Sequence, residues 1–144
     1  RDYALEDGWE PGPEYFAFMM CCHVNDTEEK AQEAAKSYLW RLRYTGLGPR
    51  EYWTPPGYIP LAPPQTPPPP RRKGTDEMTY EELQDSYHLV VGNPDSMIKK
   101  LRYIKERLGI GTLLLEAQGG RLPHKDTMRS LELLGREVIP AVRA

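Results

Sequence analysis

Two consecutive strand-turn-helix units in the second half of the chain constrain its fold most strongly. Residues 88–91 and 110–117 are short apolar runs, and a turn and then a helical pattern follow each of them. Successive βα units of this kind build parallel sheets, and parallel α/β proteins bind ligands where strands give way to helices. The two turns are Gly92-Asn93-Pro94 and Gln118-Gly119-Gly120. We therefore expect an α/β fold with its site at these turns.

A third unit of the same kind stands near the start of the chain, after an opening loop. The apolar run at 15–24 is typical of a strand buried on both faces. A helix is expected at 26–43, because Asp26 can serve as its N-cap and Glu29, three residues later, completes a capping box. All three strands are expected to be parallel, with a further short helix beginning near Thr79.

The two later helices have clear ends. Asn93 is a good N-cap and Pro94 suits the first helical position, while Gly109 suits the left-handed position after a helix at 94–108. The last helix is expected at 126–138, ended by Pro140. The apolar positions predicted to be buried are Met97, Ile98, Leu101, Ile104 and Leu108 in the first helix, and Met128, Leu131, Leu134 and Val138 in the second.

Composition excludes several classes of partner. The chain has 144 residues, of which 39% are hydrophobic and 28% charged, as in one ordinary globular domain. A net charge of −2 predicts neither a nucleic-acid partner nor an anionic membrane surface, because both usually need a concentrated basic patch. No apolar stretch approaches the roughly 20 residues needed to cross a bilayer.

The two cysteines, Cys21 and Cys22, are adjacent in the first expected strand. Neighbours on a strand point to opposite faces, so a disulfide between them would be strained. We expect free thiols that serve as small buried hydrophobes in a reducing cytoplasm. The first residues are charged and interrupted by Gly and Pro, unlike a secretory signal, which also favours a cytoplasmic location.

A proline-rich loop is expected at 44–76, between the first and second units. Most of the 15 prolines of the chain fall there, and proline permits neither a helix interior nor a central strand. Large apolar groups such as Tyr52, Trp53 and Ile59 interrupt the prolines. The loop is therefore expected to pack on the domain or to cover a site. The alternative is a proline-rich ligand for an adaptor domain, attached to a small α/β domain.

Several phrases, taken in order, carry a resemblance to a known family. They are Val-Asn-Asp-Thr-Glu-Glu-Lys-Ala at 24–31, Val-Val-Gly-Asn-Pro-Asp-Ser-Met at 90–97, Leu-Gly-Ile-Gly-Thr-Leu-Leu-Leu at 108–115, Gln-Gly-Gly-Arg-Leu-Pro-His-Lys at 118–125 and Arg-Ser-Leu-Glu-Leu-Leu-Gly-Arg-Glu-Val-Ile-Pro at 129–140. In this order and spacing the chain resembles the C-terminal end of the luciferase-like flavin monooxygenases. The proline-rich loop matches that family only in position.

The resemblance implies a TIM barrel that binds reduced FMN, supplied by a flavin reductase, and uses dioxygen to oxidise a small organic substrate. Related members use deazaflavin F420 instead. The flavin would lie at the C-terminal mouth of the barrel, the strands of this chain would be its last ones, and the long loop would match the mobile insertion that covers the active site.

The chain departs from the family in length. A TIM barrel needs eight strands and about 200 residues at minimum, whereas three strands are expected here in residues 1–144. The chain begins with Arg1, so we expect a C-terminal fragment that does not catalyse the reaction alone. The unpaired strand edges favour a homo-oligomer. The alternative is a non-catalytic module that kept the terminal βα units and dimerises through these edges.

Candidate site residues follow from the turns. Backbone amides at Gly92 and Asn93 could hold a flavin phosphate, or Asn93 could only cap its helix. Gln118 could hydrogen-bond the flavin ring and Gly119 and Gly120 could let it approach, or the three could form a plain turn.

The last βα loop also carries His124, the candidate donor or base. The three histidines, His23, His88 and His124, lack ligand spacing, so no metal site is expected. Glu116 is the one acid inside an apolar strand; it could point into the barrel, or it could be a paired structural carboxylate.

Overall fold

A computed structural model describes residues 2–44 and 73–143 of the chain. The elements of its first half are α1 (Asp2–Glu6), a 3-10 turn η1 (Pro13–Tyr15), β1 (Ala17–Val24), α2 (Glu28–Ala35) and α3 (Tyr38–Tyr44). Those of its second half are α5 (Tyr80–Asp85), β2 (Leu89–Gly92), α6 (Pro94–Leu108), β3 (Thr112–Glu116), α7 (His124–Leu133), a π-helical turn η2 (Leu134–Val138) and α8 (Ile139–Arg143). Most of the predicted proline-rich loop at 44–76 lies outside the described residues.

The three described strands form one parallel sheet, as predicted, and β1 lies in its middle. β3 pairs with the first part of β1, from Ala17 opposite Thr112 to Cys21 opposite Glu116. β2 pairs with the last part, from Cys21 opposite Leu89 to Val24 opposite Gly92. Three consecutive βα units of a barrel would instead place the second strand in the middle. Here β2, which has only four residues, lies on the other edge of β1 beside its last residues, and β1 pairs with β3 directly.

The helix predicted at 26–43 is broken into α2 and α3. The break follows Ala35, and the carbonyl of Ala34 accepts hydrogen bonds from both the amide and the hydroxyl of Ser37. Serine competes in this way with the helical backbone bonds. The predicted cap is also wrong by one residue: Thr27 is the N-cap and accepts from the amide of Lys30, while Asp26 pairs with Arg129.

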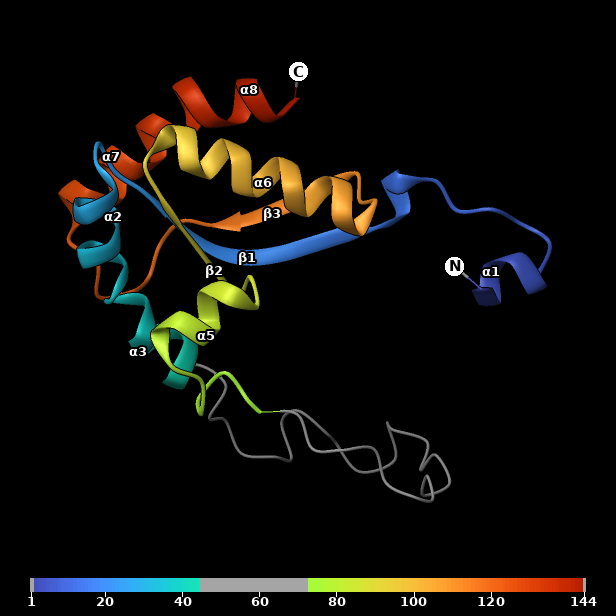
Figure 1. Cartoon of the computed structure of the whole chain (residues 1–144), viewed down its shortest axis with the longest axis horizontal. Helices are drawn as coiled ribbons and strands as arrows, with labels where there is room; N and C mark the ends of the chain where they lie inside the picture. Colours follow the sequence, from blue (N-terminus) through green and yellow to red (C-terminus); the bar gives the residue numbers. More distant parts are fainter. Residues whose placement is uncertain (1, 45–72, 144) are drawn as a thin grey trace.

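Helix α6 has the predicted ends, capped by Asn93 and closed by Gly109 at φ +59°. Its predicted buried stripe is confirmed at Met97, Leu101 and Ile104, but Leu108 is 48% exposed in the last turn. The opening segment, predicted to be a loop, contains the short helix α1, which lies apart from the sheet in Figure 1.

The last helix differs from its prediction on one face. Leu134 and Val138 are buried as predicted, but Met128 and Leu131 are about half exposed. The smaller Thr127 and Ser130 face the sheet in their place, because the Ser130 hydroxyl accepts a hydrogen bond from the amide of Val24 at 3.0 Å. Pro140 does not end the helix. It stands in the first turn of α8, after the π-helical turn, where proline is tolerated.

The sheet separates two buried clusters. One face of β1 carries Met20, Cys22 and Val24, which pack with α6, α7 and η2. Figure 1 shows α6 and α8 together on one side of the sheet. The other face of β1 carries Cys21, which packs with α2, Tyr38 and Leu83. Both cysteines are buried free thiols, as predicted, and burial raises the pKa of each to about 12.

The described residues cover only the part of the second face near the ends of the strands. Met19 is 65% exposed and Leu114, its register partner on β3, is 49% exposed. Ala17 and Thr112, one step nearer the start of the strands, are exposed as well. We call these four residues the open face. Among the described helices, none is long and apolar enough to span a membrane.

Candidate functional site

The parallel strands bring the three turns that follow them to the same border of the sheet, the edge formed by the carboxyl ends of the strands. Asn25 and Asp26 follow β1, Asn93 follows β2, and Gln118 follows β3. A groove of about 1000 Å³ lies at this edge between α2 and α7. Its charged lining residues are of both signs, namely Asp26, Lys30, Glu33, Lys125, Asp126, Arg129 and Glu132. Within this lining Arg129 forms an ion pair with Asp26. The hydrogen bond from the Arg129 guanidinium lowers the pKa of the Asp26 carboxyl.

The start of α6 already holds an anion from the chain itself. Oε2 of Glu28 accepts hydrogen bonds from the amide of Asn93 at 3.0 Å and from the Ser96 hydroxyl at 2.9 Å. Lys100 lies 3.8 Å from the other carboxylate oxygen. Burial alone would raise the pKa of Glu28, but the hydrogen bonds from Asn93, Gln32 and Ser96 lower it. Gly92 has no room for a side chain, because a Cβ there would lie 1.9 Å from the Ser96 hydroxyl.

Asn93 accordingly caps its helix, accepting from the amide of Ser96 at 2.9 Å. The amide predicted to hold a flavin phosphate is taken by Glu28, so the described residues do not form a phosphate cradle at this turn. The cofactor role of Gly92 and Asn93 stays a prediction.

The turn after β3 packs closely on α3. A Cβ at Gly119 would lie 3.0 Å from the Tyr38 ring, and one at Gly120 would lie 2.9 Å from Trp40. Gly120 also has φ +78°, which a side chain rarely adopts. The exposed Gln118 accepts from the amide of Gly120 at 2.9 Å, which closes the turn. Contacts within the chain thus account for both glycines, and a flavin contact by Gln118, Gly119 or Gly120 stays a prediction.

One charged pair borders the open face. Glu116, on the same side of β3 as Leu114, accepts from Nε of Arg41 at 2.7 Å, and the Cys21 thiol lies 3.6 Å from its other oxygen. The side chains of Glu116 and Arg41 are 29% and 34% exposed. The alternative interpretation, that Glu116 is a paired carboxylate, is therefore confirmed by its ion pair with Arg41. Local sequence does not indicate the partner of Glu116, since Arg41 is 75 residues away.

The two histidines near this edge differ in environment. His124, the predicted donor or base, is exposed at the first position of α7. His23 is fully buried on β1, and neither ring nitrogen has a hydrogen-bond partner among the described residues. Burial lowers the pKa of His23, and the nearby Asp126 opposes that shift. His23 is not among the site residues predicted from the sequence, because its only signal there is a polar residue inside an apolar run.

The predicted turns are not direct neighbours. Gly92 pairs beside Val24 on one side of β1, while β3 and its following turn lie on the other side. Strands two positions apart are about 10 Å apart. The described residues contain no cluster of three or more side chains that could hold a metal ion.

Comparison with known proteins supports the fold through solved structures of low sequence identity. No family model and no curated protein matches the sequence. Solved structures that are similar to it include two monooxygenases. One is the monooxygenase RslO1 from Streptomyces bottropensis, with a TM-score of 0.59 and 15% identity over 97% of this chain and 35% of that one.

The other is the oxygenating constituent of 3,6-diketocamphane monooxygenase, a type II Baeyer-Villiger monooxygenase from the CAM plasmid of Pseudomonas putida, in complex with FMN. It has a TM-score of 0.61 and 24% identity over 96% of this chain and 37% of that one. The structural neighbours are thus monooxygenases, in agreement with the predicted resemblance, and the likeness is one of fold. The chain spans little more than a third of the length of either structure.

Proposed function

We propose that this chain forms the C-terminal part of the barrel of a luciferase-like, FMN-dependent monooxygenase, with its open face directed into the barrel. The observation that carries this proposal is the uneven cover of the sheet. Helices cover the face of Met20 and Leu115, as on the outside of a barrel, while no described helix covers Met19 and Leu114, which are 65% and 49% exposed. Barrel interiors are filled by layers of such side chains from neighbouring strands.

The chemistry would belong to the assembled protein. Reduced FMN, supplied by a reductase, would react with dioxygen and the organic substrate there. F420 remains the alternative cofactor, and a homo-oligomeric state and a cytoplasmic location belong to the same proposal. The residues of this chain that would border the site are Glu116 with Arg41, and His124 from the last loop. With no phosphate cradle at Gly92 and Asn93, the phosphate would be held by another part of the protein.

Anaerobic titration with reduced FMN tests this proposal. The 144-residue chain alone should bind weakly or not at all, because a site at a barrel mouth draws groups from several strands. The product of the complete reading frame should bind, and Leu114→Lys within it should abolish binding by placing a charge inside the barrel. Micromolar binding by the 144-residue chain, lost on Gln118→Ala, would overturn the proposal.

A non-catalytic dimerisation module is the second candidate, and the same open face favours it. A second copy could cover Met19 and Leu114. In that case the complete reading frame would encode no further βα units, and sedimentation would show a dimer that Leu114→Lys dissociates.

A further inference from the structure

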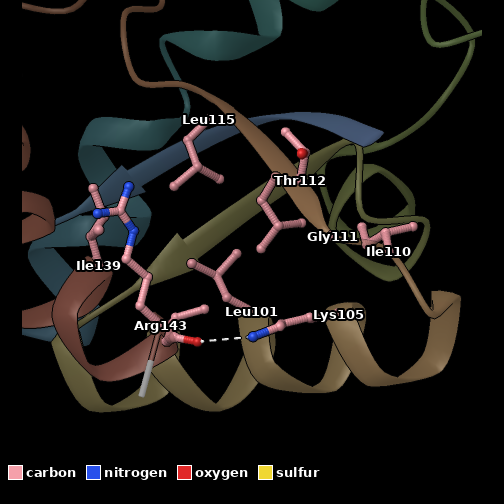
Figure 2. A pocket seen from close by; sticks show the side chains of 10 residues that line it. Leu101, Lys105, Ile110, Gly111, Thr112, Leu115, Ile139 and Arg143 are labelled. Atoms are coloured by element: carbon pink, nitrogen blue, oxygen red, sulfur yellow. Dashed lines mark hydrogen bonds between the residues drawn. The ribbon is translucent and has the colours of Figure 1, made fainter. Parts of the chain in front are cut away.

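A second cavity lies on the covered side of the sheet. It has a volume of about 380 Å³, within the range of about 300–1000 Å³ for small-molecule pockets. Figure 2 shows it between β3, α6 and α8. Its apolar walls are Leu101, Ile110, Leu113, Leu115, Ile139 and Val142.

This cavity is separate from the proposed flavin face. Leu113 and Leu115 belong to the side chains that pack against the cluster of α6 and η2, and Leu114, between them on β3, points to the open face. Thr112, at the start of β3, borders both the cavity and the open face. Beyond it, the sheet stands between the cavity and Met19 and Leu114. What binds in one need not bind in the other.

The charged groups at the cavity have one sign. Among the described residues, its charged lining residues are Lys105 and Arg143 and none is acidic, although the chain as a whole has a net charge of −2. The groove between α2 and α7 differs, since four of its lining residues are acidic. The cavity is thus apolar inside and cationic at its border.

Two hydrogen bonds hold α8 on α6 and keep the cavity formed. Nη2 of Arg102 donates to the carbonyl of Ala141 at 2.6 Å, and Nζ of Lys105 donates to the carbonyl of Val142 at 3.4 Å. The exposed Arg143 makes no hydrogen bond or ion pair with the described residues. It stands four residues after Ile139 on α8, so both side chains lie on the same side of the helix, as Figure 2 shows.

We propose that this cavity binds a medium-chain aliphatic carboxylate, with the hydrocarbon chain between β3 and α8 and the carboxylate on Arg143. An aliphatic chain matches walls made of Leu, Ile and Val. A guanidinium binds a carboxylate through two parallel N–H···O bonds, which gives the head group a defined position. Lys105 adds a second positive charge at the same border.

Calorimetric titration of the chain with decanoate, below its micelle concentration, tests the site. Decanoate should bind, and octanoate and hexanoate should bind about tenfold more weakly at each step, because each loses two buried methylenes. Decanol should bind at least fivefold more weakly than decanoate. Arg143→Gln should weaken decanoate binding by a similar factor and leave decanol unchanged.

Two further variants control the result. Arg107→Gln removes an exposed charge from α6 outside the cavity and should leave binding unchanged. Val142→Trp should fill the cavity and abolish binding, with circular dichroism confirming the fold. Absence of decanoate binding, or equal binding by the parent, Arg143→Gln and Val142→Trp, would overturn the proposal. So would a dimer that Val142→Trp dissociates, because a second copy would then occupy the cavity. None of these results depends on flavin.

Discussion

Met19 and Met20 are neighbours on β1, yet Met19 is 65% exposed and Met20 is 2% exposed. The same contrast holds on β3, where Leu114 is half exposed and Leu115 packs against the core. Burying an apolar side chain is worth about 1.5–3 kcal/mol. The chain therefore gains that energy at Met20 and Leu115, whereas the described residues give little of it to Met19 and Leu114. The open side is the one that further polypeptide would stabilise.

The two methionines allow the sharpest test of this contrast. Met20→Ala should destabilise the chain by about 2–5 kcal/mol, because it leaves a cavity in the cluster of α6 and η2. Met19→Ala should change stability by less than about 0.5 kcal/mol. Urea denaturation of both variants measures the difference. Equal losses would mean that the open face is covered in solution.

The closed end of the second face depends on the fit between α3 and the turn after β3. Gly120→Ala should cost about 1–3 kcal/mol, because alanine is strained at φ +78° and its Cβ would meet Trp40. Gly135→Ala is the matched control, since a Cβ there meets nothing within 4 Å and should be neutral or stabilising. Similar melting temperatures for the two variants would show that the turn does not pack on α3.

His23, which is buried at this closed end, should make the free energy of unfolding of the chain depend on pH. Its pKa is lowered in the folded chain by burial, whereas the unfolded chain binds a proton at about 6.5. The unfolded state therefore holds more protons below that pH. Stability should be complete above about pH 7 and fall as the pH drops, by at most about 1.4 kcal/mol per pH unit. Thermal melts between pH 7.5 and 5.5 measure this loss.

His23→Phe is the control for the pH dependence. It removes the buried titrating group but keeps His88 and His124, so the slope between pH 7.5 and 5.5 should flatten. An unchanged slope would assign the effect to another group. Asp26 and Glu28, whose pKa values are lowered, lose their contributions only at more acidic pH.

The sequence predicted those features that local residues determine. The ends of α6 followed from Asn93, Pro94 and Gly109, and the three strands followed from apolar runs. The central place of β1 did not follow, because strand order depends on contacts between distant segments. For the same reason the sequence did not reveal that Glu28 would occupy the amide of Asn93, 65 residues away.

Hydrophobic spacing alone also misassigned part of α7. Met128 and Leu131 have the spacing of a buried stripe, but the helix turns Thr127 and Ser130 to the sheet instead. Ser130 is small enough to approach β1 and accepts from the amide of Val24. A hydrogen bond at the end of a strand can thus rotate a helix away from the face with the largest side chains.

The smallest expected effect concerns the open face alone. Leu114→Lys should leave the melting temperature of the 144-residue chain nearly unchanged, because the side chain is already 49% exposed. Leu115→Lys, its neighbour on the covered face, should lower it strongly, because the charge would enter an apolar cluster. Self-association of the chain should instead be sensitive to the change at Leu114. If chains pair through the open face, sedimentation at rising concentration should show that Leu114→Lys remains monomeric where the parent associates. A large stability loss from Leu114→Lys in a monomeric chain would show that part of the same chain covers this face, and the assignment of Met19 and Leu114 to a barrel interior would fail.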